Sequence, residues 1–89
     1  MSNESIATIL DRLLRAHLPN IGDDVVIGQH EPLSRLGLDS LGMVRLAMRM
    51  EREFQVDLPD GFLIPETFET PASIAAAVAA LRPDLDIAS

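Results

Sequence analysis

The stretch "EPLSRLGLDSLGMVRL", residues 31–46, joins a turn-rich segment to a helical one. Pro32 and Gly37 disfavour a continuous helix in its first half. In its second half, apolar residues recur at the spacing of an α-helix, and this pattern continues well beyond it. Asp39 is a favourable N-cap, because its carboxylate can accept a hydrogen bond from a free N–H of the first turn. We therefore predict a helix over residues 40–54.

A first helix is predicted over residues 3–18, where apolar residues also recur at helical spacing. Its apolar stripe consists of Ile6, Ile9, Leu10, Leu13 and Leu14. Ser2 or Asn3 is the expected N-cap. The helix is expected to end before Pro19, because proline cannot continue the hydrogen-bond ladder.

A last helix is predicted to begin at Pro71, since Thr70 is a suitable cap and proline is favoured at the first helical position. Ile74, Val78 and Leu81 are expected to share one face of this helix. Arg82-Pro83 should end it, and the tail, residues 83–89, is expected to fray. Residues 65–68 predict one short helical turn before it.

The connection over residues 19–38 contains helix breakers as well as apolar residues. Its apolar content indicates packing over the helices, while a short strand at residues 25–27 is the competing local interpretation. Strands and helices do not alternate, which excludes a doubly wound α/β fold. The sequence predicts an all-α fold, a small four-helix bundle of three main helices and one short helix, with a long first loop. We expect one domain over residues 1–89, with its core at about 3–82.

The composition excludes several classes of function. Of the 89 residues, 47% are hydrophobic but only 3% are aromatic, so aliphatic side chains must fill the core. Cysteine is absent, which removes disulfides, thiolate catalysis and cysteine-ligated zinc, and the acidic residues show no calcium-loop pattern. We expect no metal site. The net charge of −7 disfavours nucleic acids and anionic membranes as partners. No apolar run has the length of a membrane span, and we expect a cytoplasmic monomer.

The helix predicted over residues 40–54 has two apolar faces when residues are placed about 100° apart. The expected core stripe consists of Met43, Leu46, Ala47, Met50 and Phe54. A second set, Leu41, Val44 and Met48, falls on another side, and its flank carries Arg45, Arg49 and Arg52. Two interpretations stay open: the long connection covers the second set, or this set is a docking surface rimmed by arginine.

Ser40 also has more than one interpretation. A hydrolase nucleophile elbow needs glycine where Leu38 stands, and His17 and His30 lie outside the motif, so we expect no catalysis by this chain. Ser40 can simply be part of a helix start. If Asp39 is the cap, however, the Ser40 hydroxyl is exposed at a helix N-terminus, where a phosphate is favoured. The chemistry therefore permits a phosphodiester at Ser40.

The motif "LGLDSL", residues 36–41, resembles the attachment motif of acyl carrier proteins. A first helix, a long loop, this motif, "EREF", "LP" and "TP" follow in the order of that family. The resemblance implies a non-catalytic four-helix bundle whose Ser40 receives 4′-phosphopantetheine from coenzyme A, through a separate phosphopantetheinyl transferase. Acyl groups would be held as thioesters on the arm, so the cofactor would bring the sulfur that the chain lacks.

The resemblance also implies which residues contact partners. Asp39 would contact the transferase, and Leu41, Val44 and Met48 match partner-facing positions of the family. Carriers of fatty acid synthesis usually have an acidic second helix, whereas Arg45, Arg49 and Arg52 stand here. We hypothesise that the partners present acidic patches, as in discrete carriers of polyketide, antibiotic or related biosynthesis.

The expected partners are the transferase, an acyltransferase or adenylating loading enzyme, and a downstream synthase or transferase. Peptidyl carriers often have glycine at the position of Leu38, so the motif favours acyl cargo. An aminoacyl or peptidyl carrier of a nonribosomal pathway is the alternative. A helical adaptor without an arm is the alternative from another class.

Overall fold

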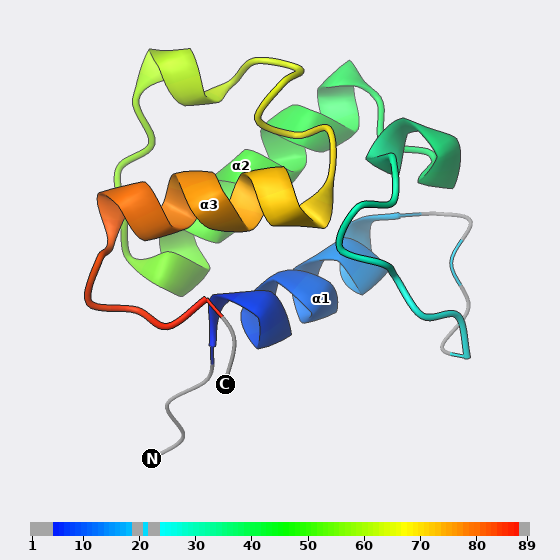
Figure 1. Ribbon diagram of the computed structural model, residues 1–89. Helices are drawn as coiled ribbons and strands as arrows, with labels where there is room; N and C mark the ends of the chain where they lie inside the picture. The colour runs from blue at the N-terminus through cyan, green and yellow to red at the C-terminus, as the bar shows by residue number, and fades with distance from the viewer. Residues whose placement is uncertain (1–4, 19–20, 22–23, 88–89) are drawn as a thin grey trace.

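The structure, a computed structural model, describes residues 5–18, 21 and 24–87. Its elements are α1 (Ile6–His17), η1 (Leu33–Leu36), α2 (Ser40–Phe54), η2 (Asp60–Phe62) and α3 (Pro71–Leu81), where η marks a 3₁₀-helix. Figure 1 shows α1 below α2 and α3, and α1 contacts both. The described residues contain no strand, so the all-α prediction is confirmed and the strand at residues 25–27 is wrong.

One apolar core holds the elements together. Its buried members from the helices are Ile6, Leu10, Leu13, Leu14, Leu46, Ala47, Met50, Phe54, Ile74, Ala75 and Val78. Ile9 and Met43 are only partly buried, and both pack against this core. Phe62 and Phe68 also belong to this core and contact each other edge to face, with ring centroids 5.7 Å apart. The helical periodicity thus placed the stripes of α1 and α2 correctly.

Helix α1 begins at Ile6 instead of residue 3, and its cap differs from the prediction. Ser5 is the N-cap: its Oγ accepts a hydrogen bond from the Thr8 N–H at 3.1 Å. The two hydroxyls of Ser5 and Thr8 are also hydrogen-bonded, at 2.9 Å. Ser5 is buried, so its oxygen satisfies a first-turn donor away from water. Ser2 and Asn3, the predicted caps, lie outside the described residues.

The connection between α1 and α2 packs against the core at one end. Leu33 is fully buried, whereas Val26 is 85% exposed. The Leu33 N–H donates to the Glu69 carbonyl at 2.9 Å, and the Ala72 N–H donates to the Gln29 carbonyl at 2.9 Å. These two bonds hold the end of the connection beside the start of α3 and the segment before it.

The short helix expected over residues 65–68 is a run of turns instead. Only hydrogen bonds between residues three apart form here, from Thr67 to Ile64 and from Phe68 to Pro65, both at 3.1 Å. The Thr67 carbonyl accepts from the Ser73 hydroxyl at 2.8 Å. The residue four positions after Thr67 is Pro71, which has no N–H to donate, so an α-helical ladder does not continue from this segment into α3.

Helix α3 starts as predicted. Thr70 and Ser73 form a reciprocal capping box, and Pro71 is the first helical residue. Ile74 and Val78 are fully buried, but Leu81, predicted on the same face, is 36% exposed. Leu81 is the last residue of the helix and lies beyond the turn that contacts the core. It is therefore partly exposed, although it shares a helix face with Ile74 and Val78.

The tail after α3 is docked over residues 84–87, which corrects the expectation of a frayed tail. The N–H groups of Ile6 and Ala7 donate to the carbonyls of Asp86 and Ile87, both at 2.8 Å. These two donors belong to the first turn of α1, which has no helical partners for them. The C-terminal segment therefore caps the first helix.

Arg82 fixes the direction in which this tail leaves α3. Its Nη1 donates to the Phe54 carbonyl at 2.6 Å, and its Nη2 pairs with Asp84 at 2.7 Å. The hydrogen bond from Arg82 lowers the pKa of the Asp84 carboxyl. The pair therefore stabilises the fold above the ordinary carboxyl pKa, and this contribution is lost as the pH falls through the lowered pKa.

Truncation after Pro83 should destabilise the fold, because the N–H groups of Ile6 and Ala7 lose their carbonyl partners. At a net value of about 0.5–1.5 kcal/mol per hydrogen bond, we expect a loss of about 1–3 kcal/mol in the free energy of unfolding. Urea denaturation followed by circular dichroism measures it. Removal of residues 88–89 alone is the matched control, and equal stability of the two truncations would contradict the capping role.

Candidate functional site

The approach to α2 depends on a glycine. Gly37 follows η1 with φ of 100°, in the left-handed region that favours glycine. Its N–H closes η1 by donating to the Ser34 carbonyl at 3.3 Å. The chain then becomes extended at Asp39, which is the backbone conformation of an N-cap.

Asp39 caps α2 as predicted. Its Oδ1 accepts a hydrogen bond from the Gly42 N–H at 2.7 Å, and its carbonyl accepts from the Met43 N–H at 2.8 Å. The helix therefore begins at Ser40 and runs to Phe54, the predicted bounds.

Ser40 lies at the exposed start of this helix. Its hydroxyl makes no hydrogen bond with the described residues. The partial positive charge of a helix N-terminus favours an anionic group at such a position. Ser40 thus combines an accessible oxygen with an environment suited to a phosphate ester.

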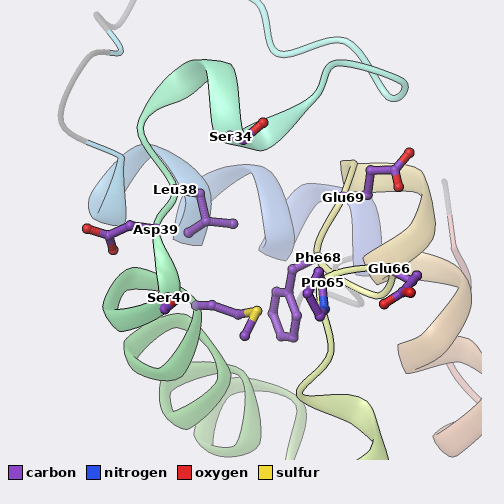
Figure 2. A pocket seen from close by; sticks show the side chains of 9 residues that line it. Ser34, Leu38, Asp39, Ser40, Pro65, Glu66, Phe68 and Glu69 are labelled. Carbon is purple, nitrogen blue, oxygen red and sulfur yellow. The ribbon is translucent and has the colours of Figure 1, made fainter.

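A groove of about 560 Å³ opens beside Ser40. Figure 2 shows Ser40 on one side and Pro65, Glu66 and Phe68 on the other. The groove is lined by Ser34, Leu38, Asp39, Ser40, Met43, Pro65, Glu66, Phe68 and Glu69. Sequence analysis did not find the contribution of residues 65–69, because this segment meets Ser40 only through the folding of the connection.

A strip of apolar side chains lies on the outer side of α2. This outer strip consists of Leu41, Val44 and Met48, whose exposed fractions are 58%, 42% and 66%. The interpretation that the long connection covers these residues is therefore wrong. An uncovered apolar strip on a small domain is typical of a contact surface.

Beside the outer strip, Arg45, Arg49 and Arg52 are all exposed, and we call them the arginine edge. None of the three forms an ion pair with the described residues. Arg82, by contrast, is paired with a carboxylate. The arginine edge is thus a local positive surface on a chain of net charge −7, and its charges are available to a partner.

The described residues give little support to histidine catalysis or metal binding at this site. Neither His17 nor His30 lines the groove around Ser40. Among the described residues, no group of histidines and carboxylates is arranged to hold a metal ion. None of the helices in the described part of the chain has the length and apolarity needed to cross a membrane.

The sequence model of the family described as "phosphopantetheine attachment site" matches residues 4–78. The chain belongs to this family. Members carry a covalently attached 4′-phosphopantetheine. They are carrier domains, typically without catalytic activity, that interact with modifying and synthase enzymes. The match confirms the family inferred from the motif at residues 36–41, and it ends before the docked tail.

Replacement of Asp39 separates its capping role from its charge. Asp39→Ala should lower the free energy of unfolding by about 0.5–2 kcal/mol, because the Gly42 N–H loses its acceptor. Asp39→Asn should retain most of the stability, since the amide oxygen can accept the same hydrogen bond. Denaturant titration measures both variants. If Asp39→Ala is as stable as the unchanged protein, the cap does not determine where α2 starts.

Proposed function

We propose that this carrier holds its 4′-phosphopantetheine on Ser40. The observation that supports this most directly is the exposed, unbonded Ser40 hydroxyl at the N-terminus of α2, inside the region matched by the family. Ser34 also lines the groove, but it belongs to a four-residue 3₁₀-helix. Of these two serines, only Ser40 lies at the start of an α-helix.

The residues around Ser40 fit the group. The first turn of α2 offers a favourable field for the phosphate, and the groove beside it has an apolar floor made by Leu38, Met43 and Phe68. The arm supplies a terminal thiol for thioester linkage, in a chain without cysteine. Asp39 holds the helix start in place through the Gly42 N–H and would be part of the transferase contact.

We propose that the outer strip and the arginine edge, with Asp39, form the surface that partner enzymes bind. An apolar centre rimmed by one sign of charge is complementary to an apolar patch rimmed by carboxylates. The partners would be a phosphopantetheinyl transferase, an acyltransferase or adenylating loading enzyme, and a downstream synthase or transferase.

The cargo we propose is an acyl group, and the pathway polyketide or related natural-product biosynthesis in the cytoplasm. The basic α2 surface supports a partner set different from that of fatty acid synthesis, because the charge on the helix is reversed. Leu38, where peptidyl carriers often have glycine, supports acyl over peptidyl cargo. The domain would act as a monomer with no nucleic-acid or membrane partner.

Incubation with coenzyme A and a promiscuous transferase tests the attachment. The unchanged protein should gain one phosphopantetheine by mass spectrometry, and Ser40→Ala should gain none, because its attacking oxygen is gone. Ser34→Ala is the matched control from the same groove and should be modified normally. Modification of Ser40→Ala, or its loss in Ser34→Ala alone, would refute the assignment.

Charge reversal tests the partner surface. Arg45→Glu/Arg49→Glu should lower kcat/KM for loading by the cognate enzyme about tenfold or more at low salt, because attraction becomes repulsion. Arg45→Lys/Arg49→Lys keeps the charge and should lose far less. The difference between the double variants should shrink as salt screens the charges. A rate that is independent of charge would exclude an acidic partner patch.

A further inference from the structure

Gly42 is the third residue of α2 and follows Ser40 by two positions. Within an α-helix glycine is less favourable than alanine, because its backbone loses more conformational freedom on folding. Gly37 needs glycine for its positive φ, but Gly42 has no such conformation. The backbone therefore does not require glycine at residue 42, which leaves the space around it as the structural reason.

Two side chains occupy the space in which a side chain of residue 42 would begin. A Cβ there would lie 3.1 Å from the Asp39 Oδ1 and 3.3 Å from the Leu38 Cδ1. Both distances are shorter than an ordinary van der Waals contact, so a neighbour would have to move. Gly28 and Gly61 differ, since a Cβ on either would meet nothing within 4 Å. Of these three glycines, only Gly42 fills a crowded position.

The Asp39 carboxylate is the neighbour that would move more easily. Leu38 is partly buried and packs against the core, whereas Asp39 is exposed. The crowded atom of Asp39, Oδ1, is also the one that accepts the Gly42 N–H at 2.7 Å. A side chain at residue 42 would therefore push the acceptor of the α2 cap away from its donor.

The cap leaves the second carboxylate oxygen of Asp39 available. Oδ2 forms no hydrogen bond or ion pair with the described residues. Asp39 directly precedes Ser40, and both residues are exposed. One oxygen thus holds the carboxylate in a fixed orientation, and the other can accept a charge-assisted hydrogen bond from a cation that approaches Ser40.

We propose that Gly42 is a positioning residue for the transfer of 4′-phosphopantetheine to Ser40. Without a side chain, it lets Asp39 cap α2 with Oδ1 and present Oδ2 to a basic side chain of the transferase. This inference rests on the proposed attachment at Ser40 and on the proposed contact of Asp39 with the transferase. Gly42 acts through Asp39 and takes no part in the chemistry.

The transfer itself makes one bond and breaks one. The Ser40 oxygen bonds to the phosphorus that carries pantetheine, the pyrophosphate bond of coenzyme A breaks, and adenosine 3′,5′-bisphosphate leaves. The serine proton passes to a base of the transferase or to water. A misplaced Asp39 would weaken binding of the carrier without changing these bonds, so KM for the carrier should respond and kcat should not.

Steady-state transfer from coenzyme A by a promiscuous transferase tests the proposal. Gly42→Ala should raise the KM for the carrier about two- to fivefold, the range of one exposed ion pair, with kcat unchanged. Gly61→Ala is the matched control, because its new Cβ meets nothing within 4 Å, and it should keep the KM of the unchanged protein. Circular dichroism checks that both variants are folded.

A double-mutant cycle tests whether Gly42 acts through Asp39. Asp39→Asn keeps an acceptor for the N–H of residue 42 but removes the charge, so it should itself raise the KM. In this background Gly42→Ala should add little, because the charge that it displaces is already absent. The hydrogen-exchange protection factor of the residue-42 amide reports the cap directly, and it should fall in Gly42→Ala.

The outcomes separate this inference from the attachment. If the unchanged protein is not modified at Ser40, the attachment is wrong and the role of Gly42 falls with it. If it is modified and Gly42→Ala has the same KM, the attachment stands and the positioning role is overturned. The role is also overturned if Gly42→Ala raises the KM equally in the Asp39→Asn background, or with the amide protection unchanged.

Discussion

The hydrogen bond between the Asp39 carboxylate and the Gly42 N–H fixes the register of α2, on which the whole site depends. One residue of shift turns an α-helix by about 100°, so a different register would move side chains of the core stripe toward solvent. A Cβ on residue 42 would approach the Asp39 Oδ1 to 3.1 Å and the Leu38 side chain to 3.3 Å. Glycine therefore leaves room for the cap to close.

The groove depends on a second set of interactions, between segments that are distant in the sequence. The Leu33 N–H binds the Glu69 carbonyl, and the Ala72 N–H binds the Gln29 carbonyl. These bonds, together with the burial of Leu33, hold the segment before α3 and the first turn of α3 against the connection before α2. Without these bonds, residues 65–69 would not be held across from Ser40, and the groove beside Ser40 would not form.

Local chemistry explains what the sequence could predict. The bounds of α2 and α3 follow from caps whose donors and acceptors are three residues apart, and the outer strip follows from helical periodicity alone. The docked tail and the position of the segment before α3 depend on bonds between distant residues, such as Ile6 with Asp86 and Leu33 with Glu69. No local pattern reveals such partners, and the groove was missed for the same reason.

Ser40 lies between the outer strip of α2 and the groove beside that helix. Leu41 of the outer strip and Met43 of the groove are two residues apart, which places them about 200° apart around α2. The groove and the outer strip therefore lie on different sides of α2. The proposed attachment at Ser40 would place the phosphopantetheine between these two sides of the helix.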